Sequence, residues 1–462
     1  MSNIANDTNI RRSDGARKTG QIFQLLVGFS TSFILAASGV EILPSIGLGL
    51  FVYSTLWFVD ATGNEIAIAP VVSMIATAQW VVGPYLAYYH DAVTLKYRMY
   101  VPEDVYFEFV VPALLAMVFA MRIFSPKINI DRVRDAIFSS HNINRRSIYY
   151  LFIVGVVADF SIFSVPNSLK FVTFIGSQFV FIASIYMLVL RMKYRWVFLA
   201  LAFTIAVSSS IEFSLFHILL LWSTLIASYI CAELRLRFTV KLAIFVGLIL
   251  LVIQLQAAKA EYRLQIHANP ESAGIGSLID SMVENALFQS SKFSSTVDGT
   301  GILNARLNQG WIISAIMNYM PAVREFENGG TILDAIEESM LPRFLVDKKD
   351  VNISSSFMEY TGLLVSRDTS FGISVLGESW VNFGEYGIIF MGFFGIFYAN
   401  VLRAIVFLSR NYPTVLFWIP LIFLQGAKAE TELVIVLNHI IKSGLLVAGL
   451  YFFCYKVLGW RI

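Results

Sequence analysis

Polar residues of several kinds gather in the stretch FGISVLGESWVNFGEYG at positions 371–387, directly before a long apolar run. Glu378 is a carboxylate that can act as a general base or hold a sugar hydroxyl. Trp380 has an aromatic face of the kind that stacks on sugar rings, and Asn382 adds a side-chain amide. A second interpretation fits equally well: Glu378 caps the next helix, and the glycines of the stretch allow close helix packing.

Arginines are the other chemically distinctive residues, and five of them precede this stretch: Arg263, Arg306, Arg324, Arg343 and Arg367. A guanidinium binds phosphate through two parallel donors and keeps its charge at any relevant pH. For any single arginine, a surface ion pair is the commoner explanation, and such pairs contribute little. For the whole set, a role in binding an anion is favoured. Arg306 begins a predicted helix and Arg343 follows a proline turn, so these two have the best-defined positions.

Motifs of soluble enzymes are missing from the sequence. It contains no P-loop, Rossmann glycine pattern, HExxH, GxSxG or CxxC, and its five histidines are scattered. Cys231 and Cys454 lie in or next to apolar segments and are expected to be small core residues rather than a disulfide or metal pair. We therefore expect no metal and no cofactor. The net charge of +2 gives no indication of a nucleic-acid partner.

The elements that must position these residues are membrane helices. The chain has 462 residues, of which 57% are hydrophobic and 14% charged, whereas soluble domains carry about 25% charged residues. Its apolar blocks have the length of a membrane-crossing helix. The sequence predicts an all-α polytopic membrane protein with about twelve spans, near 22–38, 42–59, 66–88, 104–122, 148–164, 170–190, 196–210, 213–231, 240–255, 386–408, 413–426 and 433–452.

Basic residues give the expected orientation and the domain boundaries. The Lys/Arg-rich loops and both termini are separated by even numbers of spans, so they share one side, which is cytoplasmic by the positive-inside rule. Residues 1–255 then carry helices 1–9, residues 256–385 form a large extracytoplasmic loop, and residues 386–462 carry helices 10–12. Within the loop, helical spacing predicts a small cap with helices over 276–288, 306–320 and 331–341, the last opened by a Thr331/Asp334 capping box.

Several ionisable residues fall near the ends of the predicted spans, among them Lys428, Glu430 and Glu432. Charge in a membrane is costly and usually faces a partner or a cavity. Structural ion pairs are the more common explanation for each of them. His439 and Lys442 lie three residues apart on one predicted helix, a pair that would suit either a transporter or a helix packing contact.

Three segments together resemble the Wzy-type oligosaccharide repeat-unit polymerases, also called O-antigen or exopolysaccharide polymerases. They are ARLNQGWIISAIMNYMP (305–321), ENGGTILDAIEESMLPRFLVDKK (327–349) and GISVLGESWVNFGEYG (372–387). The matching residues are Arg306, Gly330, Thr331, Pro342, Arg343, Lys348, Gly377, Glu378, Asn382, Phe383, Gly384 and Gly387. The family often has a Trp-Pro pair after the Pro-Arg, and this chain has FLVDKK there.

The resemblance implies a metal-independent, GT-C-like glycosyltransferase in the bacterial inner membrane. A glycan on undecaprenyl pyrophosphate would be the donor and a single lipid-linked repeat unit the acceptor, with the large loop in the periplasm. A chain-length regulator and a flippase of the same pathway would be partners. We expect Arg306 and Arg343 to bind pyrophosphate and Glu378 to be the base or a sugar clamp. Further substrate contacts are expected from Arg263, Arg367, Glu359, Asp368, Trp380, Asn382 and His267.

Two alternatives with their own chemistry remain open from the sequence, and so does a structural scaffold in an envelope complex, which would not require arginines organised in this way. An O-antigen ligase-type transferase would use the same donor with a different acceptor. A lipid-linked oligosaccharide flippase belongs to another class. Many transporters have two related halves with a site at the bilayer midplane, whereas this chain concentrates its polar residues in one outer loop.

Overall fold

The computed structural model describes residues 2–89, 97–139, 144–162, 164–166, 169–213, 216–249, 307–340, 353–365 and 371–459. Most residues in these ranges are helical and none of the ranges forms a strand; Glu65 and Asn129 make an isolated antiparallel bridge. The all-α class predicted from the sequence is therefore confirmed for the described residues.

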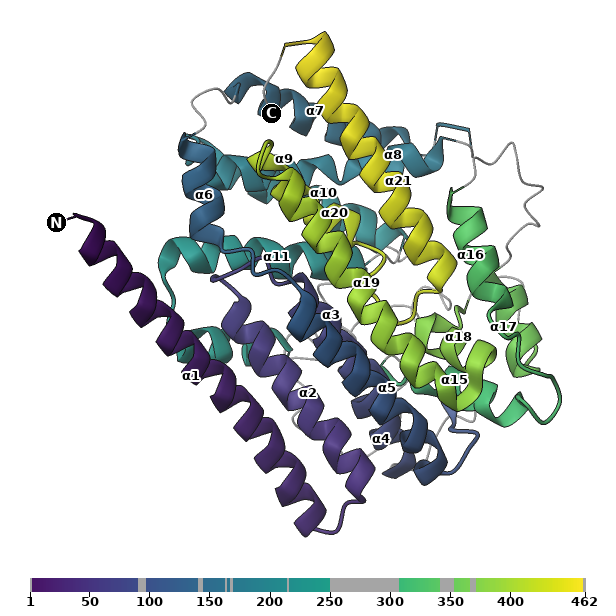
Figure 1. The fold of residues 1–462 in the computed structure, drawn as a ribbon. Helices are drawn as coiled ribbons and strands as arrows, with labels where there is room; N and C mark the ends of the chain where they lie inside the picture. The colour runs from purple at the N-terminus through teal and green to yellow at the C-terminus, as the bar shows by residue number, and fades with distance from the viewer. Residues whose placement is uncertain are drawn as a thin grey trace, which may run out of the picture.

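The first half of the chain contains a series of apolar helices (Figure 1). Their bounds are α1 Ser2–Ala37, α2 Ile42–Ala61, α3 Ile68–Thr77, a π-helix Ala78–Val82, α4 Gly83–Tyr89, α5 Glu103–Phe124, α6 Ile130–Ser139, α7 Arg145–Ser161, α8 Lys170–Ser177, α9 Phe179–Val189, α10 Arg195–Phe213 and α11 Phe216–Leu234. Residues 238–249 form a further short apolar helix.

The second half begins with shorter helices and ends with long ones. They are α15 Gly310–Tyr319, α16 Gly330–Met340, α17 Ile353–Thr361, α18 Ser374–Phe383, a 3₁₀ turn Gly384–Tyr386, α19 Gly387–Leu408, a 3₁₀ helix Pro413–Trp418, α20 Ile419–Ile422, α21 Leu433–Phe452 and a π-helix Phe453–Val457. Long helices from the two halves pack together where α19 lies along α5. Within the first half, α1 lies along α2 at the edge of the bundle (Figure 1).

Seven of the described helical stretches are long and apolar enough to cross a membrane. They are Gly20–Ala37, Ile42–Ala61, Ile68–Tyr89, Glu103–Phe124, Lys170–Val189, Ser374–Leu408 and Leu433–Val457. The apolar part of α10, Arg195–Ile205, and the stretch Pro413–Ile422, which comprises the 3₁₀ helix and α20, are shorter. The structure thus supports the prediction that the chain has several helices able to cross a membrane. The count of twelve and the orientation remain predictions.

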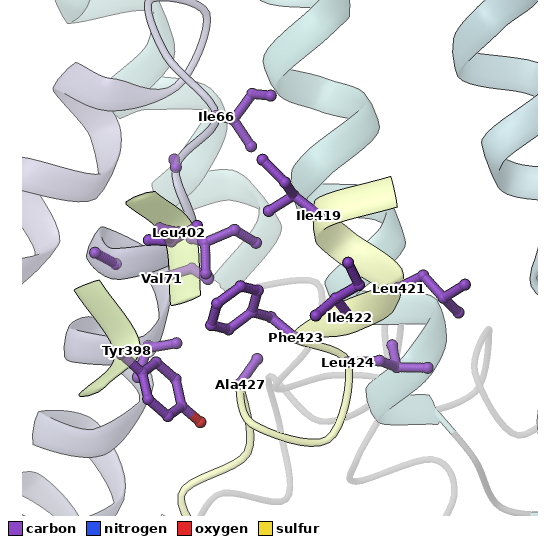
Figure 2. Close-up of a cluster of buried hydrophobic side chains, with 14 of the residues drawn as sticks. Ile66, Val71, Tyr398, Leu402, Ile419, Leu421, Ile422, Phe423, Leu424 and Ala427 are labelled. Carbon is purple, nitrogen blue, oxygen red and sulfur yellow. The ribbon is translucent and has the colours of Figure 1, made fainter. Parts of the chain in front are cut away.

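The predicted span near 413–426 ends early in the structure. Helical geometry ends at Ile422, and the next helix, α21, begins only at Leu433. Apolar side chains hold the intervening chain: Phe423 and Leu424 pack with residues of α19 and α3 in a buried cluster (Figure 2). The Tyr398 hydroxyl donates a hydrogen bond of 2.6 Å to the Gly426 carbonyl. A buried partner for a non-helical carbonyl is what an apolar environment requires.

Described residues 307–340 and 353–365 form a helical unit that we call the cap. Its own apolar core contains Trp311, Ile312, Ile316, Met320, Phe357, Tyr360, Ile373 and Val381, the last two contributed by the α18 region. The helices predicted over 306–320 and 331–341 are present as α15 and α16, and α17 was not predicted. The helix predicted over 276–288 lies outside the described residues.

The capping box predicted at Thr331 is wrong. Helix α16 begins at Gly330, so Thr331 already lies inside it, and its hydroxyl accepts a hydrogen bond from Asn382 of α18. A tertiary contact thus uses the oxygen that the local pattern assigned to a cap.

Candidate functional site

The glycine-rich stretch before the long apolar run is a helix rather than a loop. Residues 374–383 form α18, which ends where Gly384 takes a φ of +54°. A side chain is strained in that conformation, and a Cβ at Gly384 would also meet the Phe326 ring at 2.8 Å. The chain therefore turns at Gly384 and continues as α19, which carries the span predicted over 386–408.

Glu378 and Glu432 connect the starts of α18 and α21. Glu378 is 4% exposed and its Oε1 accepts a 2.8 Å hydrogen bond from the backbone N–H of Leu433, the first residue of α21. Glu432 is 2% exposed and its Oε1 accepts a 3.2 Å hydrogen bond from the N–H of Ile373, which precedes α18. Glu378 therefore does cap a helix, but that helix is α21 and not the next one along the chain.

The carboxylates of Glu378 and Glu432 are close enough to repel each other when both are charged. Burial raises the pKa of Glu432 to about 7, and the hydrogen bond from Ile373 opposes that effect. Positive helix N-termini partly compensate carboxylates placed there. Glu432 can therefore hold or release a proton near neutral pH, beside a second buried carboxylate.

Asn382 joins α18 to the cap. It is fully buried, and its Oδ1 accepts from the Gly329 N–H at 3.0 Å. Its Nδ2 donates to the Thr331 hydroxyl at 2.6 Å and to the Glu378 carbonyl at 2.8 Å. Both polar atoms of this amide have protein partners, so the geometry assigns Asn382 to positioning the start of α16.

Trp380 packs between α5 and the cap. Its indole N–H donates to the Met320 carbonyl at 3.3 Å, and its ring meets the edge of Phe109 at a centroid distance of 4.8 Å. The ring centroids of Phe326 and Trp380 lie 6.2 Å apart. These contacts fix the position of the side chain predicted to stack on a sugar.

Glu359 is engaged in an ion pair with Arg324. The guanidinium of Arg324 lies 2.8 Å from Glu359, 2.7 Å from Glu327 and 4.9 Å from the ring of Tyr360. For Arg324, the ordinary interpretation of a loop arginine as a local ion-pair partner is therefore the one that the structure supports. Glu359 was predicted as a substrate contact, and in the structure its carboxylate forms an ion pair with Arg324 within the cap.

The helix of the third predicted span is distorted where the chain that follows Arg306 packs against it. In the π-helix the Gly83 N–H donates to Ala78, which leaves the Gln79 carbonyl free to accept from Gln309 of the cap at 3.2 Å. Pro84 has no N–H, so the Trp80 carbonyl accepts instead from the Tyr106 hydroxyl at 3.0 Å. Sequence reasoning missed this site, although the Gly-Pro pair inside an apolar run was a signal for it.

Asn308 completes that docking. It is 1% exposed, its Oδ1 accepts from the Trp311 N–H at 3.1 Å, and its Nδ2 donates to the Tyr97 carbonyl at 3.2 Å. A Cβ at Gly83 would collide with the backbone of Leu307 and Asn308. The N-Q-G of the first motif segment thus anchors α15 to the end of the third predicted span.

A small cavity lies beneath α18. It has a volume of about 20 Å³, and its lining includes Trp80, Tyr398, Lys428 and otherwise mainly apolar side chains. Burial lowers the pKa of Lys428, and the charge of Glu430 opposes that effect. A cavity of this size holds about one water molecule and is too small for a sugar.

Six predicted site residues fall outside the described residues: Arg263, His267, Arg306, Arg343, Arg367 and Asp368. Their assignments stay predictions. Within the ranges that the structure describes, no three His, Cys, Asp or Glu side chains are grouped so as to hold a metal ion. Comparisons of the chain with protein families, with curated proteins and with solved structures found no match.

Proposed function

We propose that this protein is a membrane glycosyltransferase that polymerises undecaprenyl-pyrophosphate-linked repeat units into a surface polysaccharide. One observation supports the proposal most. Helix α18, which belongs to the third motif segment behind the resemblance, contacts described parts of the first and second segments. Trp380 bonds Met320 of the first segment, and Asn382 bonds Gly329 and Thr331 of the second. Backbone bonds from Glu327 and Asn328 to α18 complete the junction.

The chemistry would be displacement of a pyrophosphate at an anomeric carbon. An acceptor hydroxyl forms the new C–O bond, the bond to the pyrophosphate oxygen breaks, and the electron pair leaves with undecaprenyl pyrophosphate. The hydroxyl proton passes to a base. Cations aimed at the leaving group lower such a barrier, and this is the role we assign to Arg306 and Arg343. The reaction would take place at the periplasmic face of the bacterial inner membrane.

Glu378 keeps its assignment as base or sugar clamp, with a restriction from its geometry. Oε1 already accepts the Leu433 N–H, so Oε2 is the oxygen that would receive a proton or hold a hydroxyl. The side chain is buried, so a substrate would reach it only if the cap shifts relative to α18. Asn382, whose amide bonds Gly329 and Thr331, would control that shift.

A lipid-linked oligosaccharide flippase is the second candidate, and one observation favours it. The chain between α20 and α21 is non-helical over residues 423–432 and contains Lys428 next to a cavity. Transporters commonly place their binding sites at such interrupted helices. A ligase would share the donor of the polymerase and differ only in its acceptor.

The test compares the surface glycan and the lipid-linked intermediates of cells that lack the protein with those of complemented cells. We expect wild type to restore long chains, while Arg306→Ala and Arg343→Ala leave single repeat units on the surface. Arg410→Ala is the matched control, because Arg410 is an exposed arginine that follows α19. Normal chain length from either variant at normal protein level would overturn the site assignment.

The same experiment separates the alternatives. Accumulation of repeat units that never leave the cytoplasmic face would favour the flippase. Long chains that remain on the lipid carrier, with none transferred to a final acceptor, would favour the ligase.

A further inference from the structure

Helix α16 has three different faces. One face packs inward through Ala335 and Ser339, which are buried. A second face carries the exposed acidic residues Asp334 and Glu337, and Glu337 borders the third. The third is an apolar stripe of Leu333, Ile336 and Met340, which are 67%, 43% and 70% exposed. Spacings of three, four and seven residues place these three side chains in one row along the helix.

Helix α16 lies next to a helix that is itself long and apolar enough to cross a membrane. Helix α16 packs against α21 and lies beside its N-terminal half (Figure 1). Farther along, α21 exposes Leu445 at 67% and Phe452 at 65%. Exposed side chains of this kind on a membrane-crossing helix face lipid. Helix α16, which carries the apolar stripe, therefore packs on a helix whose exposed apolar side chains the bilayer covers.

The distribution of charge on α16 gives the orientation. Large apolar side chains exposed in a row are unfavourable in water, and the acidic residues lie to one side of the stripe, with Glu337 one turn from Leu333. A helix with an apolar stripe and a separate charged face lies at the boundary between lipid and water. We infer that α16 inserts its Leu333–Ile336–Met340 stripe into the bilayer beside α21, with acyl chains as the ligand and Asp334 and Glu337 in the aqueous phase.

This inference does not depend on the proposed glycosyltransferase activity. It makes the cap a membrane-bound element that is held at the start of α16 by Asn382 and along its length by lipid.

The experiment measures lipid exposure in the full-length protein reconstituted in phosphatidylcholine vesicles. In a background with Cys231→Ser and Cys454→Ser, single cysteines are introduced as Leu333→Cys, Met340→Cys, Asp334→Cys and Glu337→Cys and are spin-labelled. Power saturation compares collisions with oxygen, which concentrates in lipid, and with a water-soluble nickel chelate. We expect the oxygen-to-nickel collision ratio to be several-fold higher at positions 333 and 340 than at 334 and 337.

Leu445→Cys on α21 is the positive control for lipid exposure, because Leu445 is exposed on a membrane-crossing helix. Equal ratios at all four α16 positions would overturn the inference in favour of a water-exposed cap. Low collision rates with both reagents at 333 and 340, or failure of the cysteines to react, would overturn it in favour of a protein contact on the stripe. Circular dichroism of each variant verifies that the helices are retained.

Discussion

Glu378 and Glu432 each bind the start of the helix to which the other is attached. Glu378 of α18 accepts the N–H of Leu433, the first residue of α21, while Glu432 accepts the N–H of Ile373 just before α18. The first N–H groups of a helix lack partners within it, so each carboxylate satisfies one of them and interacts favourably with the helix dipole. This exchange fixes the two helix starts side by side at the base of the cap.

The first prediction concerns Glu432 and pH. Burial raises its folded-state pKa from 4.5 to about 7, so between these values the folded state holds a proton that the unfolded state releases. Stability should therefore fall as pH rises from 4.5 to 7 and level off above, by about 3 kcal/mol for this group. Glu432→Gln keeps an acceptor for the Ile373 N–H and should remove this slope. Thermal unfolding of the detergent-solubilised protein between pH 4.5 and 8 measures it; identical slopes in both proteins would contradict the prediction.

The second prediction separates the two roles of Glu378. Glu378→Gln keeps an oxygen that can accept the Leu433 N–H but cannot act as a base at neutral pH. We expect this variant to fold with a melting temperature near that of wild type and to lose polymerisation. Glu378→Ala should lose both, at a cost of about 1–3 kcal/mol for the unsatisfied buried amide. Full chain length from Glu378→Gln would restrict Glu378 to helix capping.

The third prediction concerns the junction between α18 and the cap. Asn382→Ala removes hydrogen bonds to Gly329, Thr331 and Glu378 in a fully buried position. We expect a loss of about 2–4 kcal/mol, since each such bond contributes about 1 kcal/mol and the stranded groups add a desolvation penalty. Thr331→Val removes only one of these bonds and should cost less. Limited proteolysis of the cap and thermal unfolding report the difference; equal effects of the two variants would show that Asn382 does not hold the junction.

The fourth prediction concerns the docking of the chain after Arg306. A Cβ at Gly83 would collide with the backbone of Leu307 and Asn308, so Gly83→Ala should displace this segment and reduce polymerisation. Gly444→Ala in α21 is the matched control, because no atom lies within 4 Å of the added methyl group. Replacing a helical glycine by alanine there should stabilise the protein by up to about 1 kcal/mol. Normal glycan chains from Gly83→Ala would mean that the docked segment does not support activity.

Parts of the fold could be predicted from sequence because they depend on local patterns. Apolar runs of the right length predicted membrane helices where the structure has α2, α5 and α21, and helical spacing predicted α15 and α16. The bounds were less accurate where a distant residue acts: α15 begins four residues late, at Gly310, after Asn308 caps it. Helical geometry also ends at Ile422, four residues before the predicted end of the span near 413–426, while α21 begins at Leu433 as predicted.

The candidate site was predicted in its residue types but not in its contacts. Glu378, Trp380 and Asn382 were singled out because polar residues are unusual beside an apolar run. Their bonds to Leu433, Met320 and Gly329 join parts of the chain far apart in sequence, and no local pattern encodes these partners.

The amino-acid sequence by itself determined that this chain is a helical membrane protein, because the length and apolarity of a segment decide whether it can lie in lipid. It also determined which segments contain unusual polar residues. Only the tertiary structure decided what those residues do, since a buried carboxylate or amide takes the nearest unsatisfied backbone group as its partner. Which group is nearest depends on how α18, α21 and the cap pack together.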